Sequence, residues 1–85
     1  MLIVDDQNLI RQGLKTLLEL ESDLQIVGEA ENGQIGVQQS DRLHPDVALM
    51  DIRIPVMDGV AATHAITQQS PPPKVLILTT FDDEE

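Results

Sequence analysis

Two short stretches decide how this chain folds: LIVDD at Leu2–Asp6 and VALMD at Val47–Asp51. Each is an apolar run that ends in acid, a pattern typical of a buried strand that stops at the edge of a sheet. In a parallel sheet both runs end at the same edge, so Asp5, Asp6 and Asp51 would meet there. Like charges about 4 Å apart repel by roughly 4 kcal/mol at an effective dielectric of about 20. The pattern therefore predicts either a hard-cation site or a carboxylate that is chemically changed.

The rest of the chain alternates between helix and strand signals. Apolar residues recur at helical spacing from Asn8 to about Leu20, with Asp6 or Asn8 as the expected N-cap. The other predicted elements are a strand at Gln25–Ala30 centred on Ile26 and Val27, a helix capped by Asn32 that ends before Pro45, a strand at Val47–Met50, a helix at Val60–Gln69 and a strand at Val75–Thr80. This alternation predicts an α/β fold with right-handed crossovers and a mostly parallel sheet.

Composition limits the partners of the chain. Its 85 residues make one small domain at most, and five Lys and Arg stand against fifteen Asp and Glu, for a net charge of −10. A chain this acidic lacks the basic footprint for nucleic acid and is not suited to an anionic membrane surface. Without cysteine it has no disulfide or thiolate metal site. No signal pattern or long apolar span is present, so we expect a soluble, cytoplasmic protein.

The predicted acid cluster suits magnesium and phosphoryl chemistry. Mg²⁺ prefers oxygen ligands, which Asp6, Asp51 and a backbone carbonyl just past Asp51 could supply. A carboxylate beside the ion can attack phosphorus and form an aspartyl phosphate. Thr79 ends the last predicted strand. Its hydroxyl could bond a phosphoryl oxygen on Asp51, or it could simply be a β-branched residue at a strand end.

Each of these residues also has a simpler explanation when it is taken alone. Asp5 or Asp6 could be a helix cap or a solvated charge, and Asp51 a turn residue; only their joint placement favours a site. The residues that we expect to have no chemical role are Asp58 as a helix start, Lys15 and Lys74 as solvated charges, and Met50 and Met57 as packing residues.

With these residues in place, the chain resembles the receiver domain of two-component response regulators. The motifs are VDDQ at Val4–Gln7, LMDIRIPVMDG at Leu49–Gly59 and LILTT at Leu76–Thr80. The stretches DDQNLIRQGL and LTTFDD are most similar to the transcription-factor branch with a LuxR/NarL-type helix-turn-helix. The resemblance covers residues 1–85, which we expect to form a partial receiver domain with a flavodoxin-like, doubly wound parallel sheet.

The resemblance also implies roles. Asp51 would accept a phosphoryl group from a phosphohistidine on a sensor histidine kinase. Asp5, Asp6 and Asp51 would bind Mg²⁺ together with the backbone carbonyl of Arg53, and the hydroxyl of Thr79 would sense the phosphoryl group. Such a domain is a phosphoacceptor switch rather than an enzyme, apart from its own phosphorylation and dephosphorylation. In this family the output usually comes from dimerisation and an attached effector domain, which in the LuxR/NarL-type branch would be a DNA-binding domain that regulates transcription.

The chain departs from the family pattern after its fourth strand. We expect the fold to lack most of the fourth helix, the fifth strand with its active-site lysine, the fifth helix and the effector domain. Lys74 precedes the fourth strand and cannot replace that lysine. The strand Val75–Thr80 would then be an exposed edge with unpaired backbone groups. We therefore expect a homo-oligomer or a swapped assembly, or else that the chain is the ordered part of something longer.

Two other functions remain open from the sequence. One is a receiver-like scaffold that is not phosphorylated, which failure to bind Mg²⁺ would favour. The other is a Mg²⁺-dependent phosphohydrolase with an aspartyl nucleophile, which hydrolysis of a small phosphomonoester would favour. Intact Asp5, Asp6, Asp51 and Thr79 argue against the scaffold, whereas the truncation argues for it. For the phosphohydrolase, 85 residues leave little room for a substrate-binding cap.

Overall fold

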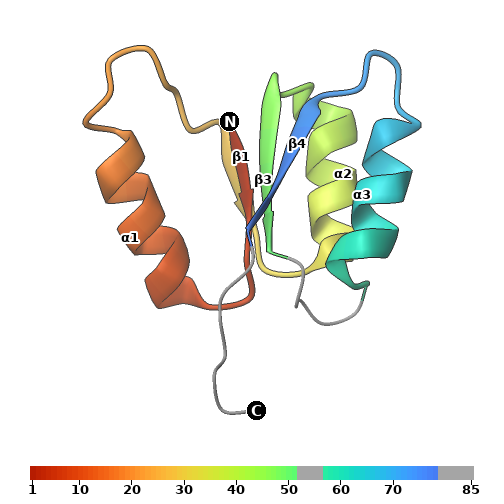
Figure 1. The fold of residues 1–85 in the computed structure, drawn as a ribbon, viewed down its shortest axis with the longest axis horizontal. Coiled ribbons are helices and arrows are strands. Elements are labelled where there is room, and N and C mark those ends of the chain that lie inside the picture. The colour runs from red at the N-terminus through yellow and green to blue at the C-terminus, as the bar shows by residue number, and fades with distance from the viewer. Residues whose placement is uncertain (52–56, 79–85) are drawn as a thin grey trace.

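A computed structural model of the chain describes residues 1–51 and 57–78. These residues form a parallel sheet with the strand order β2-β1-β3-β4, in which every neighbouring pair is parallel. The strands are β1 (Leu2–Val4), β2 (Gly28–Ala30), β3 (Val47–Asp51) and β4 (Lys74–Leu78), and the helices are α1 (Asn8–Leu18), α2 (Gly33–Leu43) and α3 (Gly59–Thr67). Helix α1 lies on one side of the sheet, and α2 and α3 lie on the other (Figure 1). The predicted flavodoxin-like, doubly wound arrangement is confirmed for these elements.

The core lies between the sheet and the α2–α3 pair. The residues of β1 are completely or almost completely buried, as expected for a central strand covered on both faces. Helix α2 comes close to β1 at Gly36, where a Cβ atom would lie only 3.0 Å from Cγ2 of Val4. The buried cluster contains Leu2, Val4, Ala30, Ala48, Met50, Ala62 and Ile66, with Met57 packed against it. The predicted packing roles of Met50 and Met57 are thus confirmed.

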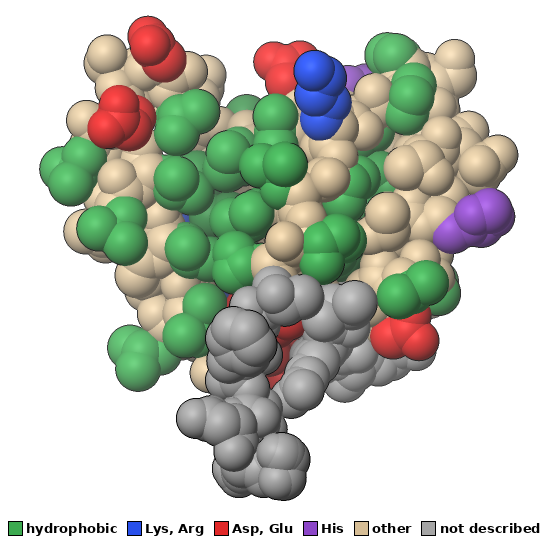
Figure 2. All heavy atoms as spheres, viewed as in Figure 1, with side chains coloured by type: hydrophobic (Ala, Val, Ile, Leu, Met, Phe, Trp, Pro, Cys, Tyr) green, Lys and Arg blue, Asp and Glu red, His purple; other side chains and the backbone are tan. Residues whose placement is uncertain are grey.

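The opposite face of the sheet is covered much less. Helix α1 has no buried residue, and Leu9 and Leu17 are 81% and 64% exposed. At the sheet edge, β4 is exposed on both faces, since its consecutive residues Leu76 and Ile77 are 54% and 45% exposed. Apolar side chains gather in the hollow between α1 and β4 (Figure 2). The prediction that β4 is an exposed edge strand is confirmed for the described part of that strand.

The first helix and second strand are shorter than predicted. Helix α1 ends at Leu18 rather than Leu20, because the amides of Leu20 and Glu21 bond carbonyls three residues back and tighten the chain into a turn. The second strand begins at Gly28 rather than Gln25, because β1 begins at Leu2 and only Met1 lies opposite the preceding residues. Ile26 and Val27 are therefore not at its centre.

Three other predicted boundaries also shift. The N-cap of α1 is Gln7 and makes no side-chain cap bond, so neither Asp6 nor Asn8 caps this helix. Helix α3 ends at Thr67 rather than Gln69, where the amides of Gln68 and Gln69 bond carbonyls three residues back. Strand β4 begins one residue early, because the amide of Lys74 already bonds the carbonyl of Asp46. The predicted end of this strand, at Thr79 and Thr80, lies outside the described residues.

Candidate functional site

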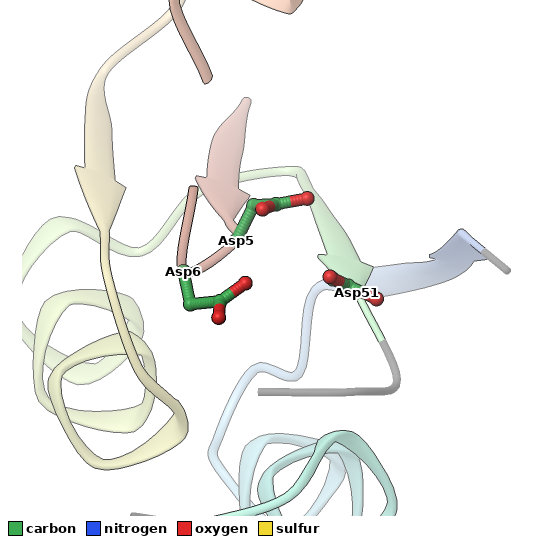
Figure 3. Close-up of side chains that lie close together, drawn as sticks. All are labelled: Asp5, Asp6 and Asp51. Carbon is green, nitrogen blue, oxygen red and sulfur yellow. The ribbon is translucent and has the colours of Figure 1, made fainter. Parts of the chain in front are cut away.

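The acid cluster is built by the register of two neighbouring strands. Val4 of β1 and Met50 of β3 are parallel partners, so Asp5, which follows β1, and Asp51, the last residue of β3, lie at the same edge of the sheet. Asp5, Asp6 and Asp51 each offer a carboxylate oxygen, and these atoms all lie within 4.8 Å of one another. The three carboxyl groups gather in the space beyond the two strand ends (Figure 3). The structure thus brings the three acids together, while their roles remain a prediction.

The three acids differ in burial. Asp5 and Asp51 are only 3% and 7% exposed, whereas Asp6 is exposed. Burial is the main reason that the pKa of Asp5 is raised, and the nearby charges of Asp51 and Asp6 raise it further. A hydrogen bond from the backbone N–H of Gln7 acts in the opposite direction. A cation bound at this point would relieve the repulsion between the three carboxylates.

The turn after β1 holds Asp5 by its backbone and by its side chain. Its backbone N–H donates to the carbonyl of Ala30 at 3.0 Å, which extends the pairing of β1 with β2. Its Oδ1 accepts the backbone N–H of Gln7 at 2.9 Å. Because the turn bonds only one of the two carboxylate oxygens, the other can face the cluster.

Helices α2 and α3, which lie on the side of the sheet opposite α1, begin near the acid cluster (Figure 1). Asn32 caps α2 as predicted, and its Oδ1 accepts the N–H of Ile35 at 2.8 Å. Asp58 starts α3 as predicted, and its Oδ1 accepts the N–H of Ala61 at 2.8 Å. A Cβ atom on Gly33 would collide with the carbonyl oxygen of Met57, so these two helix starts touch. The carboxylate of Asp58 caps α3 and is not one of the three grouped acids.

Two predicted site residues, Arg53 and Thr79, lie outside the described residues. Asp51 is the register partner of Leu78, so the described part of β4 reaches the level of the acid cluster. Lys74 pairs with Val47 at the other end of the same strands. Lys74 therefore lies at the end of β4 that is far from Asp51. This position agrees with the prediction that Lys74 cannot replace the active-site lysine.

Sequence reasoning missed a group of charges beside the acid cluster. Arg11 Nε and Lys15 Nζ of α1 contact the two carboxylate oxygens of Glu29 on β2, at 2.9 Å and 3.0 Å. Lys15 is thus paired rather than solvated, which corrects the prediction. The available signal was the spacing of Arg11 and Lys15, which places them on one face of the helix. An acid inside a predicted strand was the second signal.

The donors in the cluster decide which metal fits. Three carboxylates provide hard oxygen ligands, which suit Mg²⁺ better than a soft metal. Two of these carboxylates are largely buried, so their repulsion is weakly screened and an ion would relieve it. The described residues can therefore hold a divalent cation at this edge. Among these residues, no helix has the length and apolar character needed to cross a membrane.

Comparison with known proteins gives one consistent family. The sequence profile of the response regulator receiver domain matches residues 1–85. The transcriptional regulatory protein LnrK of Bacillus subtilis is 47% identical over 83 residues, which are 98% of this chain and 38% of LnrK. The chain thus spans about two fifths of the length of this relative and of LiaR, another transcriptional regulatory protein of Bacillus subtilis.

Solved structures agree with the sequence match. The signal receiver domain of the response regulator NarL from Mycobacterium tuberculosis superimposes with a TM-score of 0.88 at 34% identity. The match covers 98% of this chain and 67% of that one. A CheX–CheY complex with BeF3 and Mg²⁺ from Borrelia burgdorferi gives a TM-score of 0.87 at 26% identity, over 98% of this chain and 63% of the matched one.

Proposed function

The chain belongs to the response regulator receiver domain family, and from this premise we propose that Asp51 accepts a phosphoryl group from a sensor histidine kinase. The observation that carries the proposal is the cluster of Asp5, Asp6 and Asp51, whose carboxylate oxygens lie within 4.8 Å of one another at the ends of β1 and β3. Helix caps or surface charges would not require two buried acids at one point. Two buried acids at one point are expected of a site that binds a cation beside a nucleophilic carboxylate.

Asp51 is the proposed nucleophile of the three because it stands in the LMDIRIPVMDG motif at the position that accepts the phosphoryl group in the receiver-domain family. One of its carboxylate oxygens attacks the phosphorus of a phosphohistidine. The new P–O bond forms as the P–N bond breaks, and the imidazole leaves with the electron pair and takes up a proton. Asp5 and Asp6 would hold Mg²⁺ with Asp51, together with the backbone carbonyl of Arg53. When bound, the ion supplies charge that offsets the repulsion between carboxylates and phosphoryl oxygens.

Thr79 completes the proposed site as the hydroxyl that senses the phosphoryl group. It follows Leu78, whose partner in β3 is Asp51. The proposal for the whole protein is that phosphorylation in the cytoplasm controls a DNA-binding output that regulates transcription; the relative LnrK is named a transcriptional regulatory protein. Residues 1–85 would be the receiver part only. Turnover of a separate substrate is not part of this proposal.

The decisive experiment is phosphorylation of the purified chain by a small donor. The chain is incubated with Mg²⁺ and acetyl phosphate, and its intact mass is recorded beside those of Asp51→Asn and Asp41→Asn. Asp41 lies exposed on α2 and is the matched control, because it loses the same charge away from the cluster. We expect one added phosphoryl group in the parent and in the control, and none in Asp51→Asn.

Failure of the parent to gain mass, in a chain shown to be folded and to bind Mg²⁺, would overturn the proposal. Failure to bind Mg²⁺ as well would favour the unphosphorylated scaffold. Sustained hydrolysis of a phosphomonoester that depends on Asp51 would favour the phosphohydrolase. Each alternative from the sequence is thus separated by its own result.

We also propose that the chain self-associates through the edge of its sheet. Among the described residues, β4 is the last strand in the sheet order, and Leu76 and Ile77 on it are about half exposed. The open side of β4 can pair with another strand, and the hollow beside α1 can take apolar side chains (Figure 2). A second copy of the chain carries the same edge strand and the same apolar side chains. It would therefore supply both a pairing strand for β4 and apolar side chains for the hollow beside α1.

A further inference from the structure

Arg11 joins the turn that carries Asp5 and Asp6 to strand β2. Its Nη1 donates to the backbone carbonyl of Asp5 at 2.6 Å, and its Nε donates to Oε1 of Glu29 at 2.9 Å. Its Nη2 donates to Oδ1 of Asn8 at 3.2 Å. The side chain is only 11% exposed. A guanidinium holds its donors in a rigid planar fork, so bonds from all three nitrogens fix the orientation of their acceptors.

The carbonyl that Arg11 holds lies in the peptide unit that joins the two acids. The N–H of Asp5 is already bonded to Ala30, and its Oδ1 already accepts the N–H of Gln7. The bond from Arg11 fixes the remaining backbone group of Asp5. Rotation of this peptide would move Asp5 and Asp6 relative to each other, because their Cα atoms lie at its two ends. Sites of this kind tolerate displacements of only about 0.5 Å.

Glu29 anchors Arg11 from the other side. Its second carboxylate oxygen accepts from Lys15 Nζ at 3.0 Å. The bond from Lys15 is the main reason that the pKa of Glu29 is lowered, and the bond from Arg11 adds to it against the effect of burial. Glu29 therefore stays negative at neutral pH. Arg11 is thus held between a charged partner on β2 and the backbone of the acid turn.

We propose that Arg11 is a positioning residue for the acid cluster: it holds the peptide between Asp5 and Asp6 in the orientation that lets both carboxylates meet a divalent cation. The part that concerns the cation rests on the proposed function. The part that concerns the peptide rests on the hydrogen bonds alone. Partners that orient metal ligands typically change metal affinity by about 10–100-fold when they are replaced.

The peptide is tested first, without metal. Backbone NMR spectra are recorded for the parent, Arg11→Gln and Arg11→Lys in buffer that contains a chelator. The readouts are the ¹³C′ chemical shift of Asp5 and the ¹⁵N chemical shift of Asp6. Arg42→Gln is the matched control, because Arg42 is exposed on α2 and bonds Gln39 of its own helix. We expect both shifts to move in the two Arg11 variants and to stay in place in the control.

The cation is tested second, by calorimetric titration of the same proteins with Mg²⁺. We expect affinity to fall by about 10-fold in both Arg11 variants and to stay within twofold of the parent in Arg42→Gln. Lysine keeps the charge but cannot donate to Asp5 and Glu29 through a planar fork. Equal losses in Arg11→Gln and Arg11→Lys therefore indicate geometry. Retention of affinity by Arg11→Lys would indicate that only charge matters and would overturn the proposal.

The two measurements separate this inference from the proposed function. Unmoved shifts at Asp5 and Asp6 in folded Arg11 variants would overturn the positioning role whatever the metal does. Moved shifts in a chain whose parent binds no Mg²⁺ would support the role of Arg11 while overturning the metal site. If Arg11→Gln does not fold, Glu29→Gln removes the anchor instead and is expected to move the same two shifts.

Discussion

Asp5 and Asp51 lie with carboxylate oxygens within 4.8 Å of each other although the two residues are only 3% and 7% exposed. Two charged acids so close and so poorly solvated oppose folding unless something offsets them. At about 5 Å, like charges repel by roughly 3 kcal/mol at an effective dielectric of about 20. This relationship makes the stability of the chain depend on cations, on pH and on the charge of Asp5.

Asp5→Asn is expected to stabilise the metal-free chain at neutral pH by about 1–3 kcal/mol, because it removes one of two repelling charges and keeps an oxygen that accepts from Gln7. The same variant should lose the stabilisation that Mg²⁺ gives the parent. Urea unfolding with chelator and with Mg²⁺ measures both effects. Asp41→Asn, which is exposed on α2, serves as the control and should change neither. A metal-free parent more stable than Asp5→Asn would contradict the electrostatic account.

The stability of the metal-free chain should also depend on pH through Asp5. Its pKa is raised above the ordinary value of 3.8, so the folded chain binds a proton more tightly than the unfolded chain. This favourable contribution is complete below 3.8 and is lost as the pH rises through the raised pKa. The stability difference between Asp5→Asn and the parent should therefore grow over that interval and then level off. Urea unfolding at a series of pH values tests the sign, which a pH-independent difference would contradict.

Gly33→Ala should destabilise the chain by about 1–3 kcal/mol, because its new Cβ would meet backbone atoms that cannot rotate away. That Cβ would collide with the carbonyl oxygen of Met57. Gly13→Ala is the matched control, because nothing lies within 4 Å of its added Cβ on α1. The control should gain up to about 1 kcal/mol from helix propensity. Thermal unfolding of both variants decides the prediction, which equal effects at the two sites would refute.

Thr63→Val is expected to leave stability unchanged or to raise it by about 1 kcal/mol. The Oγ1 atom of Thr63 is buried and has no hydrogen-bond partner among the described residues. Ser40→Ala provides the contrast, because Oγ of buried Ser40 donates to Oε1 of Gln69 at 2.7 Å and links α2 to the turn that follows α3. Loss of this hydrogen bond should lower the free energy of unfolding by about 1–2 kcal/mol. Chemical unfolding should give changes in the free energy of unfolding that are opposite in sign or clearly unequal for Thr63→Val and Ser40→Ala. A larger loss of stability in Thr63→Val would contradict the conclusion that the Thr63 hydroxyl makes no hydrogen bond among the described residues.

Ile77→Lys should weaken self-association of the chain, because a charge on the edge strand opposes pairing with a second strand. Val60→Lys is the matched control, since Val60 is 64% exposed on α3, across the sheet from α1. Light scattering over a range of concentrations measures the mass of each protein. The parent and the control should associate as concentration rises, while Ile77→Lys should stay monomeric. A monomeric parent at every concentration would exclude the proposed assembly.

Much of the fold followed from local patterns. The apolar runs at Leu2–Val4 and Val47–Met50 are short and continuous, which is how a strand buried on both faces reads in a sequence. The caps Asn32 and Asp58 were recognisable because their side chains satisfy amides three residues ahead. Element boundaries were less predictable, as the late start of β2 at Gly28 shows, because pairing with β1 sets them.

The candidate site was predictable in its acids but not in its support. Parallel strands end at one edge, so acids that follow two apolar runs can be expected to meet from their positions in the sequence alone. The bond from Arg11 to the carbonyl of Asp5 carries no comparable signal. It depends on where α1 lies against the sheet, and the same is true of the contact from Lys15 to Glu29.

The sequence by itself determined the alternation of strands and helices, the acids at the strand ends and the excess of negative charge, because these depend on neighbouring residues or on composition. Only the tertiary structure decided that Asp5 is buried beside Asp51, that Arg11 holds the turn, and that α1 has no buried residue. Those features arise from contacts between segments far apart in the chain. Register, helix placement and solvent exclusion exist only after the segments have packed together.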